Sequence, residues 1–136
     1  MMIPEINFCH AAISVGNLEE SIAWYCDCLG FELVSQEYVP PVDATVATLR
    51  RGAVELEIFY YPGAAPMTEE RMDPNRDPHT QGVKHFCLGT DRLEEMVNQL
   101  RDKGVEIVVG PVKLRKNTLY YIHDNSGNPI ELMQRG

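Results

Sequence analysis

Two histidines and two glutamates occupy matching places in the two halves of this sequence, and their side chains are of types that bind metal ions. The separation from His10 to Glu57 differs by one residue from that between His85 and Glu131. Neither residue type is easily held on a buried strand unless it is paired or bound. Two imidazoles and two carboxylates would neutralise a divalent cation and leave two octahedral positions for water or substrate. Ligands without thiolate suit Ni, Co, Zn, Mn or Fe(II).

The chain around these residues is an internal repeat. Each half carries a Leu-Glu-Glu triplet, at Leu18 and Leu93, the same distance after its histidine. Each half then has a glycine before a strand-like run, and each ends in an apolar-Glu-apolar triplet. Duplication alone would keep the packing residues of both halves. Paired His and Glu at equivalent places indicate a shared metal site as well.

Each half is predicted to fold as a βαβββ module, which gives an α+β fold class. In the first half we expect strands at 6–15, 31–39, 45–50 and 53–61 around a helix that Asn17 and Glu20 cap and Gly30 ends. In the second half we expect strands at 83–88, 105–109, 118–124 and 129–134, with a helix capped by Asp91 and Glu94 and ended by Gly104. Module one is thus expected at 3–62, an irregular linker at 62–82 and module two at 83–134, within a single domain over 1–136.

Side-chain alternation places the four candidate ligands on one face of the sheets. Residues two apart on a strand share a face, so His10 lies opposite the apolar row that packs under the helix. The same parity puts Glu57, His85 and Glu131 on the face away from the helices. Because each helix has few large apolar positions, we expect curled mixed sheets with the helices on the outer face.

Several neighbouring residues compete with this interpretation. Glu55 shares the face of Glu57 and lies one pleat away, although the repeat favours Glu57. A strand histidine is often only a hydrogen-bonded structural residue, and a strand glutamate can serve solubility alone. Cys87 can line the cavity or pack inertly, whereas Tyr121 and His123 can support the site or lie on the surface.

Composition and charge exclude several functional classes. The 136 residues carry a net charge of −8, which argues against nucleic acid as a partner. No apolar run approaches the roughly 20 residues of a membrane span, and the start has no signal-like segment, so we expect a cytoplasmic protein. The four cysteines form no CxxC pair and are expected to be reduced thiols. A local basic loop at Lys113, Arg115 and Lys116 could meet an anionic substrate or simply be solvated.

These features together resemble the vicinal oxygen chelate superfamily, which includes glyoxalase I, methylmalonyl-CoA epimerase, bleomycin- and fosfomycin-resistance proteins and extradiol dioxygenases. The matching segments are HAAISVGNLEESIAWYCDCLGFELV, VELEIFYYPG, GVKHFCLGTDRLEEMVNQLRDKGVEIV and DNSGNPIELMQ, nearly the whole chain apart from the linker. The resemblance implies paired βαβββ modules around a divalent metal, with ligands from the first and fourth strands of each module. Those positions in this sequence are His10, Glu57, His85 and Glu131.

The resemblance also implies the chemistry. In glyoxalase-type members the metal chelates vicinal oxygens of the substrate, an enediolate forms, and the glutamate at the position of Glu131 moves the proton. Glu57 is its symmetry-related partner. We therefore expect a metal-dependent, glyoxalase-like lyase or isomerase that acts on a small molecule with vicinal oxygens. The alternatives are a dioxygenase of the same superfamily and a non-enzymatic, drug-binding resistance protein.

Departures from the family's patterns bear on the substrate. Bacterial glyoxalase I enzymes hold glutathione with a basic residue four after the first His and an Asn four after the first Glu, where this sequence has Ser14 and Tyr61. The paired histidines of the epimerase are absent, since Lys84 precedes His85. Dioxygenases and fosfomycin enzymes use a His-His-Glu set, so the carboxylate of Glu57 favours a lyase or isomerase.

The quaternary structure follows from the same reasoning. Two modules with open sheet edges and small cores gain by pairing, so we expect a homodimer. In the family that this sequence resembles, modules pair within a chain or across a dimer interface. The metal site can therefore form within one chain or between two.

Overall fold

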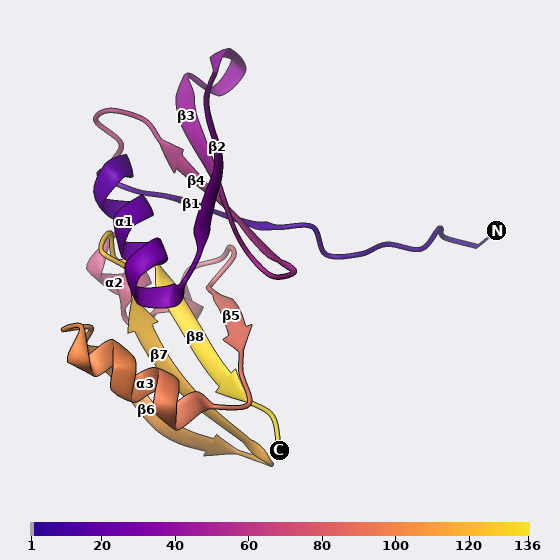
Figure 1. The fold of residues 1–136 in the computed structure, drawn as a ribbon, viewed down its shortest axis with the longest axis vertical. Coiled ribbons are helices and arrows are strands. Elements are labelled where there is room, and N and C mark those ends of the chain that lie inside the picture. Colours follow the sequence, from indigo (N-terminus) through magenta and orange to yellow (C-terminus); the bar gives the residue numbers. More distant parts are fainter. Residues whose placement is uncertain (1) are drawn as a thin grey trace.

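The two halves of the chain fold as modules with the same order of elements, in a computed structural model that describes residues 2–136 (Figure 1). Module one consists of β1 (Ala11–Ser14), α1 (Leu18–Leu29), β2 (Glu32–Val39), a 3-10 turn (Pro40–Val42), β3 (Ala44–Arg51) and β4 (Val54–Tyr60). Module two consists of β5 (Phe86–Gly89), α3 (Leu93–Asp102), β6 (Ile107–Leu114), β7 (Asn117–His123) and β8 (Pro129–Gln134). The predicted α+β fold of tandem βαβββ modules is confirmed.

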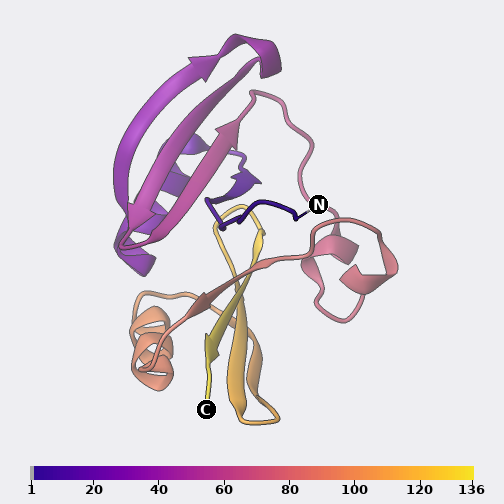
Figure 2. The same cartoon turned by 90° about the vertical axis from the view of Figure 1, so that its right-hand side faces the viewer.

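Each module arranges its strands in a mixed, four-stranded sheet. The strand orders are β1-β4-β3-β2 and β5-β8-β7-β6. The first strand of each module pairs in parallel with the last strand, and the other pairs are antiparallel. Figure 2 shows the sheet of module one above the sheet of module two. Both β1 and β5 are edge strands, and no strand within residues 2–136 pairs with their outer edges.

The helix ends agree with the prediction except at the start of α3, and Gly104 follows the end of α3 in the left-handed conformation as expected. The Asn17 side chain accepts a hydrogen bond from Glu20 N at 3.0 Å, and Gly30 ends α1 in the left-handed conformation with φ 72°. The predicted Asp91 cap of α3 is wrong, because α3 begins one residue too late for the Asp91 side chain to cap it. Instead, the Gln134 side chain on β8 accepts a hydrogen bond from Leu93 N at 3.1 Å, so tertiary structure supplies this cap.

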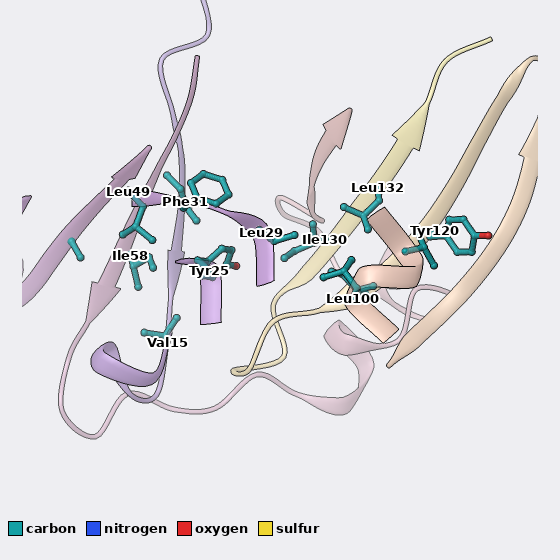
Figure 3. Close-up of a cluster of buried hydrophobic side chains, with 14 of the residues drawn as sticks. Val15, Tyr25, Leu29, Phe31, Leu49, Ile58, Leu100, Tyr120, Ile130 and Leu132 are labelled. Carbon is teal, nitrogen blue, oxygen red and sulfur yellow. The ribbon is translucent and has the colours of Figure 1, made fainter. Parts of the chain in front are cut away.

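One apolar cluster packs the helices against the sheets of both modules (Figure 3). Each helix covers one face of its own sheet, as the sequence predicted, and leaves the opposite face for the candidate ligands. The buried side chains that Figure 3 labels are Val15, Tyr25, Leu29, Phe31, Leu49, Ile58, Leu100, Tyr120, Ile130 and Leu132. Because the cluster is shared, the hydrophobic effect holds the two modules together as well as folding each of them.

The turn between β7 and β8, residues 124–128, also joins the two modules. Asp124 is only 5% exposed, and its carboxylate accepts hydrogen bonds from the Tyr25 hydroxyl at 2.7 Å and from the backbone of Ser126 and Asn128. The Asn128 side chain donates to Ser14 O at 3.0 Å. These contacts attach the turn of module two to α1 and β1 of module one, and we call it the inter-module turn.

Both first strands begin later than the sequence predicted. β1 starts at Ala11 rather than at residue 6, and β5 starts at Phe86 rather than at residue 83. Pairing begins where Ala11 meets Leu56 and where Phe86 meets Ile130, so the preceding residues have no strand beside them. Residues 2–9 are exposed and lead away from both sheets (Figure 1). The observed bounds of β6 also differ from the prediction, since this strand covers 107–114 instead of 105–109.

The linker is more ordered than the irregular segment that the sequence predicted. It contains the short helix α2 (Glu69–Met72) and a 3-10 turn (Asp77–His79). Figure 2 shows this segment beside the sheets rather than under them. Among residues 2–136, no helix combines the length and the apolar character that crossing a bilayer requires.

Candidate metal site

The first candidate pair of ligands connects β1 with β4. His10 immediately precedes β1, and Ala12 on β1 lies in register with Glu57 on β4, so His10 and Glu57 share a face. His10 Nε2 is 3.2 Å from Glu57 Oε1. The side chains are 40% and 28% exposed, which leaves this pair open to solvent on one side.

The second candidate pair repeats this geometry in module two. His85 immediately precedes β5, and Cys87 on β5 lies in register with Glu131 on β8. His85 Nε2 is 3.2 Å from Glu131 Oε2, the same separation as in module one. The Glu131 side chain is only 10% exposed, so this pair is the more enclosed of the two.

The two pairs remain apart within one chain. His10 and His85 both line a cavity of about 1040 Å³ between β1 and β5. Nevertheless, nowhere in the described part of the chain do three His, Cys, Asp or Glu side chains approach closely enough to hold one metal ion. Within residues 2–136 the structure thus shows two separate pairs, each with one imidazole and one carboxylate, and we call each pair a candidate half-site.

Glu55, the competitor of Glu57, is engaged by a different residue. Its Oε1 accepts a hydrogen bond from Arg50 Nη2 at 3.0 Å, across the β3–β4 pair in which these two residues lie in register. The arginine therefore compensates the charge of Glu55, whereas the carboxylate of Glu57 is directed to His10. The geometry favours Glu57 over Glu55 as the oxygen donor of the first half-site.

Two protonated side chains flank the Glu131 carboxylate. Cys87 and Tyr121 lie in register with Glu131 on the neighbouring strands β5 and β7. Burial and the Glu131 carboxylate raise the pKa of the Cys87 thiol to about 12. Burial, a hydrogen bond to Glu131 and its charge likewise raise the pKa of Tyr121. The Tyr121 ring also meets His85 edge to face, with ring centroids 5.2 Å apart, so it contacts both members of the half-site.

Other residues that the sequence singled out lie outside the two half-sites. The His123 ring forms a hydrogen bond between its Nε2 and Met72 O at 2.6 Å, which attaches β7 to the linker. Cys26 and Cys28 are free thiols that pack against the apolar cluster. The basic residues Lys113, Arg115 and Lys116 are exposed where β6 turns into β7.

The linker and the start of module two contribute residues that the sequence analysis missed. Arg71 and Lys84 line the same cavity as the two histidines, and both bind the buried carboxylate of Asp77, with Nε–Oδ1 at 2.5 Å and Nζ–Oδ1 at 3.2 Å. Burial alone would raise the pKa of the Asp77 carboxyl, but hydrogen bonds from Lys84 and Arg71 outweigh burial and hold this pKa below its ordinary value. One local signal was available. Thr68 precedes two acidic residues, a pattern typical of a helix start, and its side chain does cap α2.

Comparison with known proteins identifies the family of this chain. A sequence model of the Glyoxalase/Bleomycin resistance protein/Dioxygenase superfamily matches residues 7–132. A probable lactoylglutathione lyase from Synechocystis sp. is 29% identical over 127 residues, which cover 92% of each protein. A putative lactoylglutathione lyase from Brassica oleracea var. gemmifera is also 29% identical, over 95% of this chain but only 44% of that longer protein.

A solved structure shares the fold of this chain. The crystal structure of the glyoxalase family protein from Enterococcus faecalis has a TM-score of 0.78 to this chain, at 23% identity, over 93% of this chain and 96% of that one. That likeness shows the fold, and the sequence match extends over nearly the whole chain. This protein therefore belongs to the Glyoxalase/Bleomycin resistance protein/Dioxygenase superfamily.

Proposed function

We propose that this protein is a metal-dependent, glyoxalase-like lyase or isomerase that acts on a small molecule with vicinal oxygens, by proton transfer through an enediolate. The observation that carries the proposal is the repeated His–Glu pair, with the same 3.2 Å separation on equivalent strands of both modules. The relatives named as probable and putative lactoylglutathione lyases support this reaction class.

The donor atoms of the two pairs fit a divalent cation. Imidazole nitrogen and carboxylate oxygen are ligands that suit Ni, Co, Zn, Mn and Fe(II). Two ligand atoms at about 2.1 Å from one ion and at right angles to each other would be about 3.0 Å apart. The observed nitrogen–oxygen separation of 3.2 Å in each pair is close to that value. His10, Glu57, His85 and Glu131 are therefore the proposed metal ligands.

Glu131 is the proposed general base. A bound divalent cation would supply Lewis-acid polarisation of the vicinal oxygens of the substrate. A base that takes a proton from one carbon and returns it to the next must keep one orientation within reach of both. Glu131 has the smaller exposure of the two carboxylates, and Cys87 and Tyr121 flank it with protonated groups. Glu57 occupies the symmetry-related position and is the proposed second catalytic carboxylate.

A homodimer is proposed to bring the half-sites together. β1 and β5 each have an outer edge without a strand partner, and His10 and His85 stand at the starts of these two strands. If β1 of one chain lies beside β5 of a second chain, the first pair of one subunit faces the second pair of the other. A two-fold symmetric dimer of this kind contains two complete four-ligand sites.

Subunit mixing tests the metal site and the dimer together. Either His10→Ala or His85→Ala, made in separate proteins, removes one ligand from every site, and we expect a sharp loss of divalent-metal affinity in calorimetry and elemental analysis. The exposed His79 provides the control variant His79→Ala, which is expected to bind metal normally. Unchanged metal affinity in both ligand variants would refute the proposed site.

Mixing the two variants by refolding should restore binding to about a quarter of all sites. Random association makes half of the dimers mixed, and each mixed dimer has one site with both substitutions and one with neither. No restoration on mixing would show that each site forms within one chain.

The reaction class is tested by solvent-deuterium incorporation into 2-oxoaldehyde thiol adducts, acyl-CoA thioesters and 2-hydroxyketones. Metal-dependent exchange is the expected result. Oxygen consumption with catechols would instead support the dioxygenase, and drug binding without metal or turnover would support the resistance protein.

A further inference from the structure

We propose that Arg71 and Lys84 form a binding site for an anionic group of the substrate, a carboxylate or a phosphate, next to His85. The role of this site in substrate recognition rests on the proposed function, whereas its capacity to bind an anion does not. The argument starts from where these two side chains lie and from what they contact.

Both cationic side chains line a small hollow beside the second half-site. This hollow has a volume of about 90 Å³, and its lining includes Arg71, Asp77, Lys84, His85 and Tyr121. It is built only from the linker and module two, so its lining does not depend on how chains associate. One water needs about 10–15 Å³ of such space. The hollow therefore has room for a group of several heavy atoms, such as a carboxylate or a phosphate.

The charges around the hollow leave a positive surplus. The Asp77 carboxylate is 5% exposed, and both cations bind it through Oδ1. Two cations against one carboxylate give the Asp77 cluster (Arg71, Asp77 and Lys84) a net charge of +1, in a protein whose net charge is −8. Because one cation is enough to neutralise a buried carboxylate, the second leaves a positive charge that no other described residue lining the hollow neutralises.

Arg71 has a hydrogen-bond donor left for such an anion. Its Nε donates to Asp77 Oδ1 and its Nη2 donates to Val83 O, both at 2.5 Å, and neither bond uses Nη1. By contrast, Lys84 Nζ donates to Asp77 O at 2.8 Å and also to Thr80 O. Arg71 therefore provides the direct hydrogen bond, and Lys84 provides positive charge at close range. A guanidinium fork suits carboxylates and phosphates in particular.

The same two residues connect the hollow to the reaction site. Arg71, Lys84 and His85 also line the larger cavity, which His10 borders from the other module. Among the described residues that line this larger cavity, Arg71 and Lys84 are the ones with permanent positive charge. A substrate bound with its vicinal oxygens at the proposed metal position would thus extend its anionic end toward the Asp77 cluster.

Anion binding is tested first on the metal-free protein by NMR titration. We expect inorganic phosphate or succinate to shift the Arg71 side-chain signal and the His85 amide in a saturable way, whereas neutral succinamide leaves them unchanged. Arg71→Gln should weaken anion binding about tenfold or more, since it removes a charge-assisted hydrogen bond. The matched control is Arg76→Gln, on the same segment, because Arg76 is half exposed and lies 4.0 Å from Glu70. Equal effects of the two variants, or equal shifts with succinamide, would overturn the proposal.

A second variant changes the affinity in the opposite direction. Asp77→Asn removes the carboxylate that competes for Arg71 and Lys84, so a folded Asp77→Asn protein should bind phosphate or succinate more tightly than wild type. A role of these residues in structure alone predicts no gain in affinity. This variant keeps the proposal testable if Arg71→Gln does not fold. An affinity of Asp77→Asn for phosphate or succinate that is equal to or weaker than that of wild type would contradict the proposed anion site.

Metal-loaded protein separates this proposal from the proposed function. Cobalt-loaded protein is titrated with three hydroxamates that differ at the far end: butyrohydroxamate is neutral, succinate monohydroxamate carries a carboxylate, and phosphoglycolohydroxamate carries a phosphate. We expect the anionic compounds to bind more tightly than the neutral one, and Arg71→Gln to abolish this preference without changing metal affinity. The tighter anionic compound identifies the group that the site prefers.

Failure of the proposed function would give a different result from failure of the anion site. No metal and no hydroxamate would bind, while the phosphate and succinate titrations of metal-free protein remained intact. Equal binding of neutral and anionic hydroxamates by metal-loaded protein would overturn the anion site alone.

Discussion

Replacing Tyr25 by phenylalanine removes one hydrogen bond from the contact between the two modules. The Tyr25 hydroxyl donates to Asp124 Oδ2 at 2.7 Å, and the Tyr25 side chain is completely buried at 0% exposure. Burial, followed by the charge of Asp124 and this hydrogen bond, raises the pKa of Tyr25, so the hydroxyl stays protonated and keeps donating at ordinary pH. Because Tyr25 is fully buried in the apolar cluster, a water that replaced the lost donor would have to enter that cluster.

The expected loss of stability is about 2 kcal/mol. A hydrogen bond to a charged acceptor contributes about 1.5–3 kcal/mol. The Asp124 carboxylate keeps its bonds from Ser126 N, Asn128 N and Asn128 Nδ2, which places the loss in the lower part of that range. At about 4 °C per kcal/mol for a protein of this size, the melting temperature should fall by about 8 °C.

The chain contains a matched control for this substitution. Tyr38 also donates to an aspartate, Asp43 Oδ1 at 2.6 Å, but its side chain is 57% exposed. Tyr38→Phe should therefore lower stability much less than Tyr25→Phe does, as expected for a substitution on the exposed surface. Both variants are compared with wild type by urea unfolding without metal and at one protein concentration, because association and ligands shift apparent stability. Equal losses in the two variants would refute the argument that burial of the Tyr25–Asp124 bond gives it its strength.

Three further predictions concern the site and the linker. Glu57→Gln should lower divalent-metal affinity sharply in calorimetry, whereas Glu55→Gln should change it little. The reverse result would show that Glu55, and not Glu57, is the ligand on β4. Glu131→Gln should keep part of its metal binding but lose about 10²-fold or more of solvent-deuterium exchange, as expected for removal of a general base; near-normal exchange would exclude Glu131 as the base. The lowered pKa of Asp77 means that its ion pairs stabilise the fold above the ordinary aspartate pKa of about 3.9, and that this contribution disappears as the pH falls through the lowered pKa. In urea unfolding, the stability difference between wild type and Asp77→Asn should therefore shrink on acidification, and a difference that grows would contradict this sign.

The sequence predicted the modules well because their signals are local. Strand alternation and helix periodicity are properties of short segments, and they placed His10 with Glu57 and His85 with Glu131 on shared faces, as the pairs at 3.2 Å show. The starts of β1 and β5 were wrong because a strand begins only where its partner strand is available, and that depends on the partner. Whether the four residues bind metal stays a prediction.

Two other features could not be predicted from apolar periodicity. The separation of the two half-sites depends on the relative placement of the modules, which the contact between Tyr25 and Asp124 helps to set across a long stretch of sequence. The order in the linker comes from ion pairs around the buried Asp77 rather than from apolar periodicity, so a search for periodicity could not find it.

The inter-module turn has a consequence for how chains assemble. The proposed contact of β1 in one subunit with β5 in the next would join two different surfaces. Such head-to-tail contacts close into a ring or continue as an open filament, according to the rotation between subunits. In the proposed dimer that rotation would depend on the angle between the two modules, which the Tyr25–Asp124 and Asn128–Ser14 hydrogen bonds help to fix. Weakening the inter-module turn would therefore widen the range of angles and favour open-ended polymers over closed pairs. In this way a hydrogen-bonded turn outside both half-sites would decide whether the subunits form a closed dimer or an open-ended polymer.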